Sequence, residues 1–402
     1  MRVLLFTGKG GVGKTTLAAA TAARLAADGH KALVVSTDPA HSLADALGMP
    51  LGAEPSEVDG AGLFAAQVDA RSLVDGAWQD LRGHLHTVLA GAGVDEVQAE
   101  ELTVLPGVEE LLALSEVQRL ATCGPWETVV VDCGPTAETL RLLALPEALA
   151  GYLERLFPTH RRVVRGLLAG LAGSSTVERW DAAADALGRL AERLEALRSM
   201  LVDQDVTSVR LVLTPERVVA AETRRTLTAL ALQGIRVDRL VANRLLPDGD
   251  DTDGVAARWL RTRRAEQDAV LGELGGDVRT PLDTVGHRAE EPVGVPALLE
   301  VAAELYGGGD PLSGAERAEL IEVSGGGKGL DSEYGMRLHL PLAADAQLEL
   351  ARVDDELVIT LDGRRRLVAL PAVLRRCEIV GATADNEGIT VRFRPDPRVW
   401  MR

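Results

Sequence analysis

Short runs of apolar residues alternate with longer amphipathic stretches up to about residue 306. Strands that are apolar along their whole length are typical of a parallel sheet covered by helices on both faces. The pattern therefore predicts an α/β domain with a mainly parallel sheet, and a helix over Leu17–Ala27 after its first strand. Strands are predicted over Val3–Thr7, Ala32–Ser36, Leu63–Val68, Thr128–Asp132, Val209–Thr214 and Arg239–Asn243.

Two stretches, 71–121 and 139–204, replace this alternation with helical patterns alone. Within 177–201, Ala, Leu and Met recur every three or four residues among Arg and Glu, as in an amphipathic helix. We interpret both stretches as helical insertions in one domain that spans residues 1–306.

The pattern changes after Tyr306. Glycine runs at 307–309 and 325–327 are typical of a linker, which we place at 307–335 with a short helix over Ala315–Val323. From 336 to 402, apolar and polar residues alternate in short runs that turn residues separate. This period of two predicts a small C-terminal all-β sandwich.

The 402 residues carry 43 lysines and arginines against 60 aspartates and glutamates, a formal net charge of −17. Affinity for nucleic acid comes mostly from basic side chains at phosphates, and no dense basic block is present, so we expect no nucleic-acid partner. No apolar run reaches the roughly 18 residues of a membrane-spanning helix, and the apolar start of the chain is shorter than a secretory signal. We expect a cytoplasmic protein.

The segment from Gly8 to Thr16 fits G-x-x-x-x-G-K-[ST] between a predicted strand and a predicted helix. In such a loop, backbone N–H groups point at phosphate oxygens, and the helix N-terminus adds partial positive charge. We expect Lys14 to reach the β- and γ-phosphates of ATP, and Thr15 to complete the shell of Mg²⁺. The predicted nucleotide-binding residues of this loop are Gly8, Lys9, Gly10, Gly11, Val12, Gly13, Lys14, Thr15 and Thr16.

Two carboxylates end predicted strands, where parallel sheets present their ligand-binding loops. Asp38 is predicted to orient the attacking water and to belong to the metal site with Thr15. Asp132 is predicted to hold Mg²⁺ through its water shell. An aspartate after a strand is often only a helix cap, so the adjoining phosphate loop is what favours this interpretation.

A lysine at the second position of the loop, Lys9, is not needed by an ordinary phosphate loop. The sequence G-K-G-G-V-G-K-T-T resembles the deviant P-loop class, in which this lysine reaches the nucleotide of a partner subunit. The resemblance implies an active homodimer in which Lys9 neutralises transition-state charge in trans. The predicted catalytic residues are Asp38, Lys9 and Lys14.

Several segments over about residues 1–305 resemble the family of the arsenite-pump ATPase and of the ATPase that guides tail-anchored membrane proteins. The resemblance implies an ATP-driven homodimer whose helical subdomains open and close over a client. It assigns Asp38 and Asp132 to two switch regions, Asn243 to the adenine contact, and the loop at Pro281 to the base. The segments are S-T-D-P-A-H-S at 36–42, P-G-V-E-E at 106–110, D-C-G-P-T-A-E-T-L-R-L-L at 132–143 and V-A-N-R-L-L-P at 241–247.

The chain departs from the family at several positions. Ala137 and Glu138 stand in the second switch where members commonly have Gly and His, so the coupling of hydrolysis to subdomain movement is open. The C-x-x-C of the tail-anchor targeting dimers is absent, and we expect no zinc. Arsenite prefers thiolates, but Cys123, Cys133 and Cys377 form no recognisable set for it; their odd number fits a reducing compartment.

The evidence for a client lies in the apolar stretches Leu140–Leu149 and Val163–Leu171 of the insertions. Either they form a groove for a protein or membrane-protein client, with transient membrane association, or they pack into an ordinary core. The chain has only 5 methionines, so it offers no methionine-rich surface of the kind that binds apolar partners promiscuously.

The C-terminal runs 353–361, 364–371 and 388–393 resemble the α-crystallin (small heat-shock) fold. This resemblance implies a β-sandwich that contacts partners or regulates the ATPase. We interpret the arginines at 364–366 as either a patch for a polyanion or a solvated turn.

Other functions remain as alternatives. One is a spatial-organisation switch of the MinD or ParA kind on membrane or DNA, although the chain ends in β-type sequence at 393–402 instead of an amphipathic helix. Others are an anion (arsenite) transport ATPase and a non-catalytic scaffold.

Overall fold

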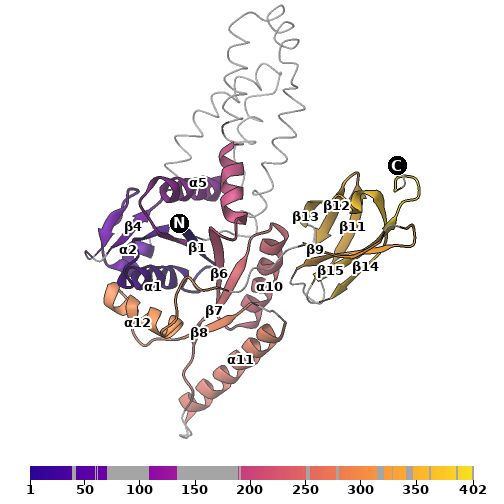
Figure 1. Ribbon diagram of the computed structural model, residues 1–402. Helices are drawn as coiled ribbons and strands as arrows, with labels where there is room; N and C mark the ends of the chain where they lie inside the picture. The colour runs from indigo at the N-terminus through magenta and orange to yellow at the C-terminus, as the bar shows by residue number, and fades with distance from the viewer. Residues whose placement is uncertain are drawn as a thin grey trace, which may run out of the picture. The chain divides into compact units, whose positions relative to one another are not determined.

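The structure is a computed structural model. Its internal contacts divide the chain into two compact units, one comprising Met1–Thr7, Lys14–Thr207 and Pro292–Ala303, the other Gly8–Gly13, Ser208–Glu291 and Glu304–Arg402. Figure 1 shows the helices and strands in chain order. The structure describes residues 1–38, 42–58, 60, 62–69, 108–133, 189, 192–249, 254–277, 280–314, 321–327, 329–340, 347–361, 364–385 and 388–400.

The first unit is built on a mostly parallel sheet. Its strands are β1 (Arg2–Thr7), β2 (Ala32–Ser36), β3 (Ser56–Val58), β4 (Leu63–Gln67) and β5 (Thr128–Asp132). They are hydrogen-bonded in the order β3-β4-β2-β5-β1, and only β3 runs antiparallel to its neighbour. Every residue of β2 and β5 is buried, as expected for strands covered on both faces. The predicted strands are confirmed; β3 was not predicted, because three residues are too few to show a period.

Helices of the first unit include α1 (Lys14–Ala27), α2 (Ser42–Leu47) and α5 (Val108–Cys123). Most of α1 is buried, and its run of small alanines packs against β2 and β5. Of the helical insertions predicted at 71–121 and 139–204, the structure describes α5 and a helix over 192–202 with a few flanking residues. The rest of both stretches, including Leu140–Leu149 and Val163–Leu171, lies outside the described residues.

The second unit contains a parallel trio of strands and two long helices. The strands are β6 (Thr207–Leu213), β7 (Val237–Leu245) and β8 (Leu282–Gly286), with β7 between the other two. The helices are α10 (Arg217–Leu232) and α11 (Val255–Asp277), and α12 (Val295–Tyr306) follows β8. Strand β8 was not predicted, because its residues are mostly half-buried or exposed and lack an apolar run. In the part of the chain that the structure describes, no helix has both the length and the hydrophobicity that a membrane crossing requires.

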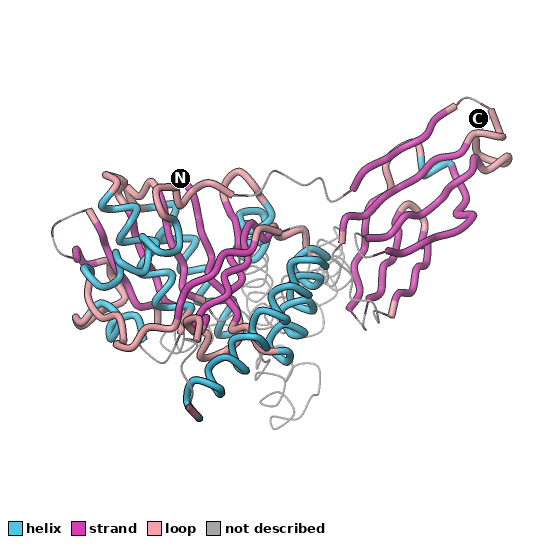
Figure 2. Tube along the Cα trace, turned by 90° about the horizontal axis from the view of Figure 1, so that it is seen from below, coloured by secondary structure: helices cyan, strands magenta, loops and turns pink. Residues whose placement is uncertain are grey.

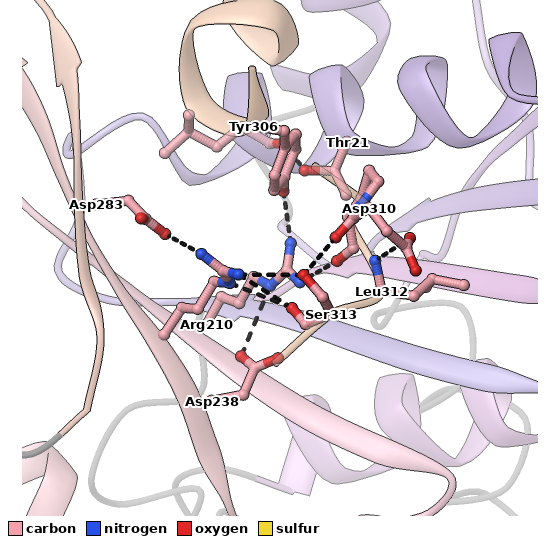
Figure 3. A network of polar contacts seen from close by, with 11 residues as sticks. Thr21, Arg210, Asp238, Asp283, Tyr306, Asp310, Leu312 and Ser313 are labelled. Atoms are coloured by element: carbon pink, nitrogen blue, oxygen red, sulfur yellow. Dashed lines mark hydrogen bonds and ion pairs between the residues drawn. The ribbon is translucent and has the colours of Figure 1, made fainter. Parts of the chain in front are cut away.

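A buried arginine on β6 anchors the segment that follows α12 (Figure 3). The guanidinium of Arg210, which is 0% exposed, donates to the Tyr306 hydroxyl at 2.5 Å and to the carbonyl of Pro311. Its Nε lies 3.6 Å from Oδ1 of Asp238, a carboxylate whose two buried oxygens accept no hydrogen bond. The attraction between Arg210 and Asp238 therefore offsets the free energy that it costs to remove each charge from water.

The C-terminal part is an all-β sandwich, as predicted, and Figure 2 shows it almost entirely as strands and loops. One sheet has the order β14-β15-β10-β9 and the other β11-β12-β13, with every pairing antiparallel. Met336, Ile359 and Phe393 are fully buried in the core between them. The strands are β9 (Ile321–Gly326), β10 (Glu333–His339), β11 (Leu348–Val353), β12 (Glu356–Leu361), β13 (Arg364–Ala369), β14 (Cys377–Asp385) and β15 (Gly388–Pro395).

Three sequence predictions for this part were wrong. The linker predicted for 307–335 ends early, because β9 pairs with β10 and belongs to the sandwich. Residues 321–323, assigned to the end of a helix, lie in β9, while 315–320 fall outside the described residues. Gly325 has φ +85°, and a Cβ there would lie 2.3 Å from the carbonyl oxygen of Glu333, so this glycine permits close strand approach and not linker flexibility. The arginines at 364–366 lie in β13 and not in a turn.

Candidate functional site

The glycines after β1 shape a loop that side chains would block. Gly8, Gly11 and Gly13 have φ values of +147°, +80° and +93°, in the range that favours glycine. A Cβ on Gly8 would lie 2.1 Å from the carbonyl oxygen of Val212, and one on Gly13 would lie 2.2 Å from Nδ2 of Asn243. The G-K-G-G-V-G segment therefore forms a tight backbone cradle, the shape that phosphate binding by N–H groups requires.

Asn243 fastens this loop to β7. Its side-chain amide donates to the carbonyl of Val12 at 2.8 Å, and its Oδ1 accepts from the backbone N–H of Arg244 at 2.9 Å. The nitrogen of the amide thus holds the loop, and its oxygen holds Arg244, whose φ is +60°. The predicted contact of Asn243 with adenine remains a prediction.

The helix α1 begins at the predicted phosphate-binding lysine. Lys14 is its first residue and is 7% exposed, so a buried cation stands at the end of the helix where backbone N–H groups lack helical partners. Thr15 follows, and its hydroxyl donates to Oδ2 of Asp132 at 2.8 Å and lies 3.0 Å from the hydroxyl of Ser42. The sequence motif and the carboxylate predicted for the metal are therefore in direct contact.

Asp132 is a fully buried carboxylate at the end of β5. Its Oδ2 accepts hydrogen bonds from Thr15 and, at 2.9 Å, from Ser36, whereas its buried Oδ1 accepts none. Burial raises the pKa of Asp132, while the two hydroxyls and the charge of Lys14 oppose that shift. A buried carboxylate oxygen without a partner fits a position that a cation or its water shell completes.

These residues fit the Mg²⁺ that a nucleotide brings. Magnesium is usually bound by one or two carboxylates together with phosphates and waters, and not by a cage of protein ligands alone. The hydroxyl of Thr15 and the carboxylate of Asp132 are in contact, and the charge of Asp38 is near enough to affect the pKa of Asp132. One hydroxyl and one or two carboxylates are a donor set that suits a metal shared with phosphates.

Asp38 follows β2 and is positioned through its backbone. Its N–H donates to the hydroxyl of Ser36 at 3.2 Å, and its carbonyl accepts from the Gln67 side chain at 2.7 Å. The negative charge of Asp38 contributes to the raised pKa of Asp132. The two predicted carboxylates are thus close enough to interact.

Sequence reasoning did not assign roles to Ser36, Ser42 and Gln67. Ser36 and Gln67 are the last residues of β2 and β4, and both are buried and polar at the ends of otherwise apolar strands. Both serve as a sequence signal for the site, because each is a polar residue at the end of an apolar strand, where parallel sheets bind ligands.

Lys9, at the second position of the loop, forms an ion pair with Glu222 of α10. Lys9 Nζ and Glu222 Oε2 are 3.4 Å apart, and the side chains are 45% and 46% exposed. The carboxylate partner was not predicted, because the two residues are far apart in sequence.

Pro281 is not brought to the cradle. It precedes β8, and its carbonyl accepts from Leu240 near the start of β7. Pro281 therefore lies at the amino end of β8 and beside Leu240 in the first half of β7, whereas Asn243 lies toward the carboxyl end of β7. The predicted contact of Pro281 with the base stays a prediction.

Ala137 and Glu138 of the second switch region lie outside the described residues. The cysteines are free: Cys123 is exposed, while Cys133 and Cys377 are buried, and burial raises the pKa of both buried thiols.

Comparison with known proteins extends these observations. Residues 1–307 match the family described as anion-transporting ATPase, and residues 331–393 match the HSP20-like domain found in ArsA. The chain is 41% identical to protein Rv2184c of Mycobacterium tuberculosis, over 99% of this chain and 97% of that protein. It is 33% identical to a putative arsenical pump-driving ATPase of Chlorobaculum tepidum, over 98% and 96% of the two chains. It is also 31% identical to the ATPase get3 of Aspergillus terreus, over 70% of this chain and 85% of that protein.

Proposed function

The chain belongs to the family of anion-transporting ATPases and hydrolyses ATP, and on this premise we propose that it works as a Mg²⁺-dependent homodimer that binds and releases a protein client. The observation that carries the catalytic part is the hydrogen bond between Thr15, which follows the phosphate loop in sequence, and Asp132. The proposal of a dimer is based on Lys9, and the proposal of a protein client is based on the family resemblance. A cytoplasmic location completes the proposal.

In the proposed mechanism, the N–H groups of the loop and the ammonium group of Lys14 bind the phosphates. Thr15 and Asp132 would hold Mg²⁺, which would neutralise charge on the phosphate oxygens when bound. Asp38 orients the attacking water from its place after β2, where Ser36 and Gln67 hold its backbone. A bound cation would offset the cost of burying the ionised carboxylate of Asp132.

In the proposed dimer, the ammonium group of Lys9 in one subunit acts on the nucleotide bound to the other subunit. Its side chain is 45% exposed, so a second copy has access to it. A compact ammonium group that reaches the partner's nucleotide stabilises the charge that develops on the transferred phosphoryl group. Hydrolysis then depends on dimer formation.

The anion-transport alternative is favoured by the printed names of relatives such as the putative arsenical pump-driving ATPase of Chlorobaculum tepidum. Arsenite prefers thiolates, yet in this chain the thiols of Cys133 and Cys377 are buried, and burial favours their neutral form. Turnover measured with and without arsenite separates the alternatives: stimulation supports anion transport, and an unchanged rate supports the protein client.

The client proposal is tested by trapping the ATP state. The full chain with Asp38→Asn is incubated with ATP and Mg²⁺ in lysate, and light scattering measures its mass. We expect a dimer and a co-purifying protein that are both lost with ADP and in Lys14→Ala. A monomer with ATP contradicts the dimer. Sedimentation with liposomes or DNA that depends on ATP favours the MinD or ParA alternative instead.

A further inference from the structure

Helix α10 is in contact with the C-terminal sandwich at its last turn. Arg366 of β13 donates from its guanidinium to the carbonyls of Ala231, at 3.3 Å, and Leu232. These carbonyls belong to the end of the helix, where C=O groups lack helical partners and the helix dipole is negative. A cation at this position therefore stabilises the helix and joins the two elements.

Apolar packing reinforces this contact. Leu232, the last residue of α10, is 2% exposed and belongs to the same hydrophobic cluster as the sandwich core residues Leu357 and Val368; Ala231 packs against the cluster. In β13, Arg366 lies on the same face as Val368, which is 4% exposed, whereas Arg365 points to the other face and is exposed. The sandwich thus has a defined docking surface for the end of α10, formed by Arg366 and the core around Leu232.

The same helix carries the partner of Lys9. Glu222 lies ten residues before Leu232, or about 15 Å along a helix. It is the one acidic residue within α10, and its Oε2 lies 3.4 Å from Nζ of Lys9. A hydrogen-bonded helix that stays rigid would carry a displacement of its last turn to Glu222.

We propose that Glu222 is a positioning residue that holds Lys9 within its own chain, and that the docked sandwich maintains this hold through α10. A lysine held by its own chain must leave Glu222 before it reaches the nucleotide of a second copy. The sandwich therefore opposes assembly of the active dimer, and its release from α10 favours assembly. This inference rests on the proposed role of Lys9 in trans.

The test measures ATP turnover against the concentration of the full-length chain and compares the concentrations at which turnover is half-maximal. Glu222→Gln removes the charge and keeps the shape, with Glu216→Gln, just before α10, as its control. Arg366→Met removes the docking cation, with the exposed Arg365→Met as its control. Arg366→Lys keeps a cation at the helix end, so its half-maximal concentration is expected to stay close to that of the wild type.

We expect Glu222→Gln and Arg366→Met each to lower the half-maximal concentration about two- to fivefold, the range of an exposed ion pair. If the sandwich acts through Glu222, Arg366→Met has no further effect in the Glu222→Gln background. A purely structural loss would lower maximal turnover and leave the half-maximal concentration in place.

Several outcomes overturn the inference. They are a Glu222→Gln value equal to that of Glu216→Gln, a full effect of Arg366→Met in the Glu222→Gln background, and turnover independent of chain concentration in every variant. Should Arg366→Met fail to fold, the Glu222→Gln comparison decides alone. Wild-type turnover in Lys9→Ala would instead contradict the proposed function, whereas an inactive Lys9→Ala with an unchanged Glu222→Gln contradicts only this inference.

Discussion

The hydroxyl of Thr15 donates a hydrogen bond of 2.8 Å to Oδ2 of Asp132, although 117 residues separate the two in sequence. The contact joins the first turn of α1 to the end of β5 and leaves Oδ1 of Asp132 buried without a partner. The unpaired oxygen makes the ionised carboxylate costly to bury.

Replacing Asp132 by Asn is expected to stabilise the nucleotide-free protein at neutral pH and to reduce Mg²⁺-dependent turnover. Burial raises the pKa of Asp132 above its usual value of 3.8, so the folded state favours the protonated carboxyl. The resulting stability is fully present below the usual pKa and is lost as the pH rises through the raised pKa. The difference in melting temperature between variant and wild type should therefore grow from pH 4 to pH 8, roughly the range over which such a group titrates. A variant that melts below wild type at pH 8 would contradict this account.

Replacing Asp38 by Asn should slow turnover by about 10²–10⁴-fold, the usual contribution of a group that handles the nucleophile's proton. ATP binding should survive, because the loop and Lys14 bind the phosphates. Phosphate release measures the first effect, and equilibrium binding of a fluorescent ATP analogue measures the second. Equal turnover in variant and wild type would exclude the assigned role.

Replacing Lys14 by Ala should remove ATP binding and lower turnover by at least about 10²-fold, since a buried cation that contacts the phosphates is lost. Lys31→Ala is the matched control. Its ammonium group lies 5.4 Å from the ring centroid of Phe64 and 5.6 Å from that of Trp126, so its loss should affect stability slightly and turnover little. Similar losses of turnover in both variants would show that Lys14 has no special role.

Replacing Gly13 by Ala should lower the melting temperature of the nucleotide-free protein, whereas Gly10→Ala should change it little. Gly13 has φ +93°, and its Cβ would lie 2.2 Å from Nδ2 of Asn243, so the change strains the backbone by at least about 1 kcal/mol and displaces the amide. No atom lies within 4 Å of a Cβ on Gly10. Equal melting temperatures for the two variants would show that Asn243 does not constrain the loop.

Replacing Arg210 by Met should destabilise the protein by about 3–5 kcal/mol, because the buried carboxylate of Asp238 loses its compensating charge. The double variant Arg210→Met with Asp238→Leu should recover part of this loss, since neither charge remains buried. Urea unfolding measures both effects. A double variant as unstable as the single one would assign the loss to the hydrogen bonds with Tyr306 and Pro311 instead.

The elements that sequence patterns predicted best are those with a dominant local signal. The strands β1, β2 and β5, buried throughout except for Arg2 at the start of β1, show as apolar runs, and the period of two marks β10, β11, β12 and β15. Strand β13 begins with three arginines and was missed, because its identity depends on pairing with β12. The glycines of β9 suggested a linker, whereas the structure uses Gly325 for close strand approach.

The candidate site divides in the same way. The residues of the phosphate loop are adjacent in sequence, so their spacing alone predicted a cradle and the roles of Lys14 and Thr15. The ion pair of Lys9 with Glu222 and the contact of Asn243 with Val12 join segments that no local pattern connects. Pro281 was assigned by resemblance, and only the parallel register of β7 and β8 showed that it lies at the amino end of β8.

The sequence by itself determined the chemistry that this protein offers, a phosphate loop with two lysines and two aspartates at strand ends, because these residues act through short, contiguous motifs. The tertiary structure decided which groups meet: Thr15 with Asp132, Lys9 with Glu222, and Arg366 with the end of α10. Such contacts follow from the packing of helices on strands and the register of strands. They depend on the whole chain and leave no signal at the residues that make them.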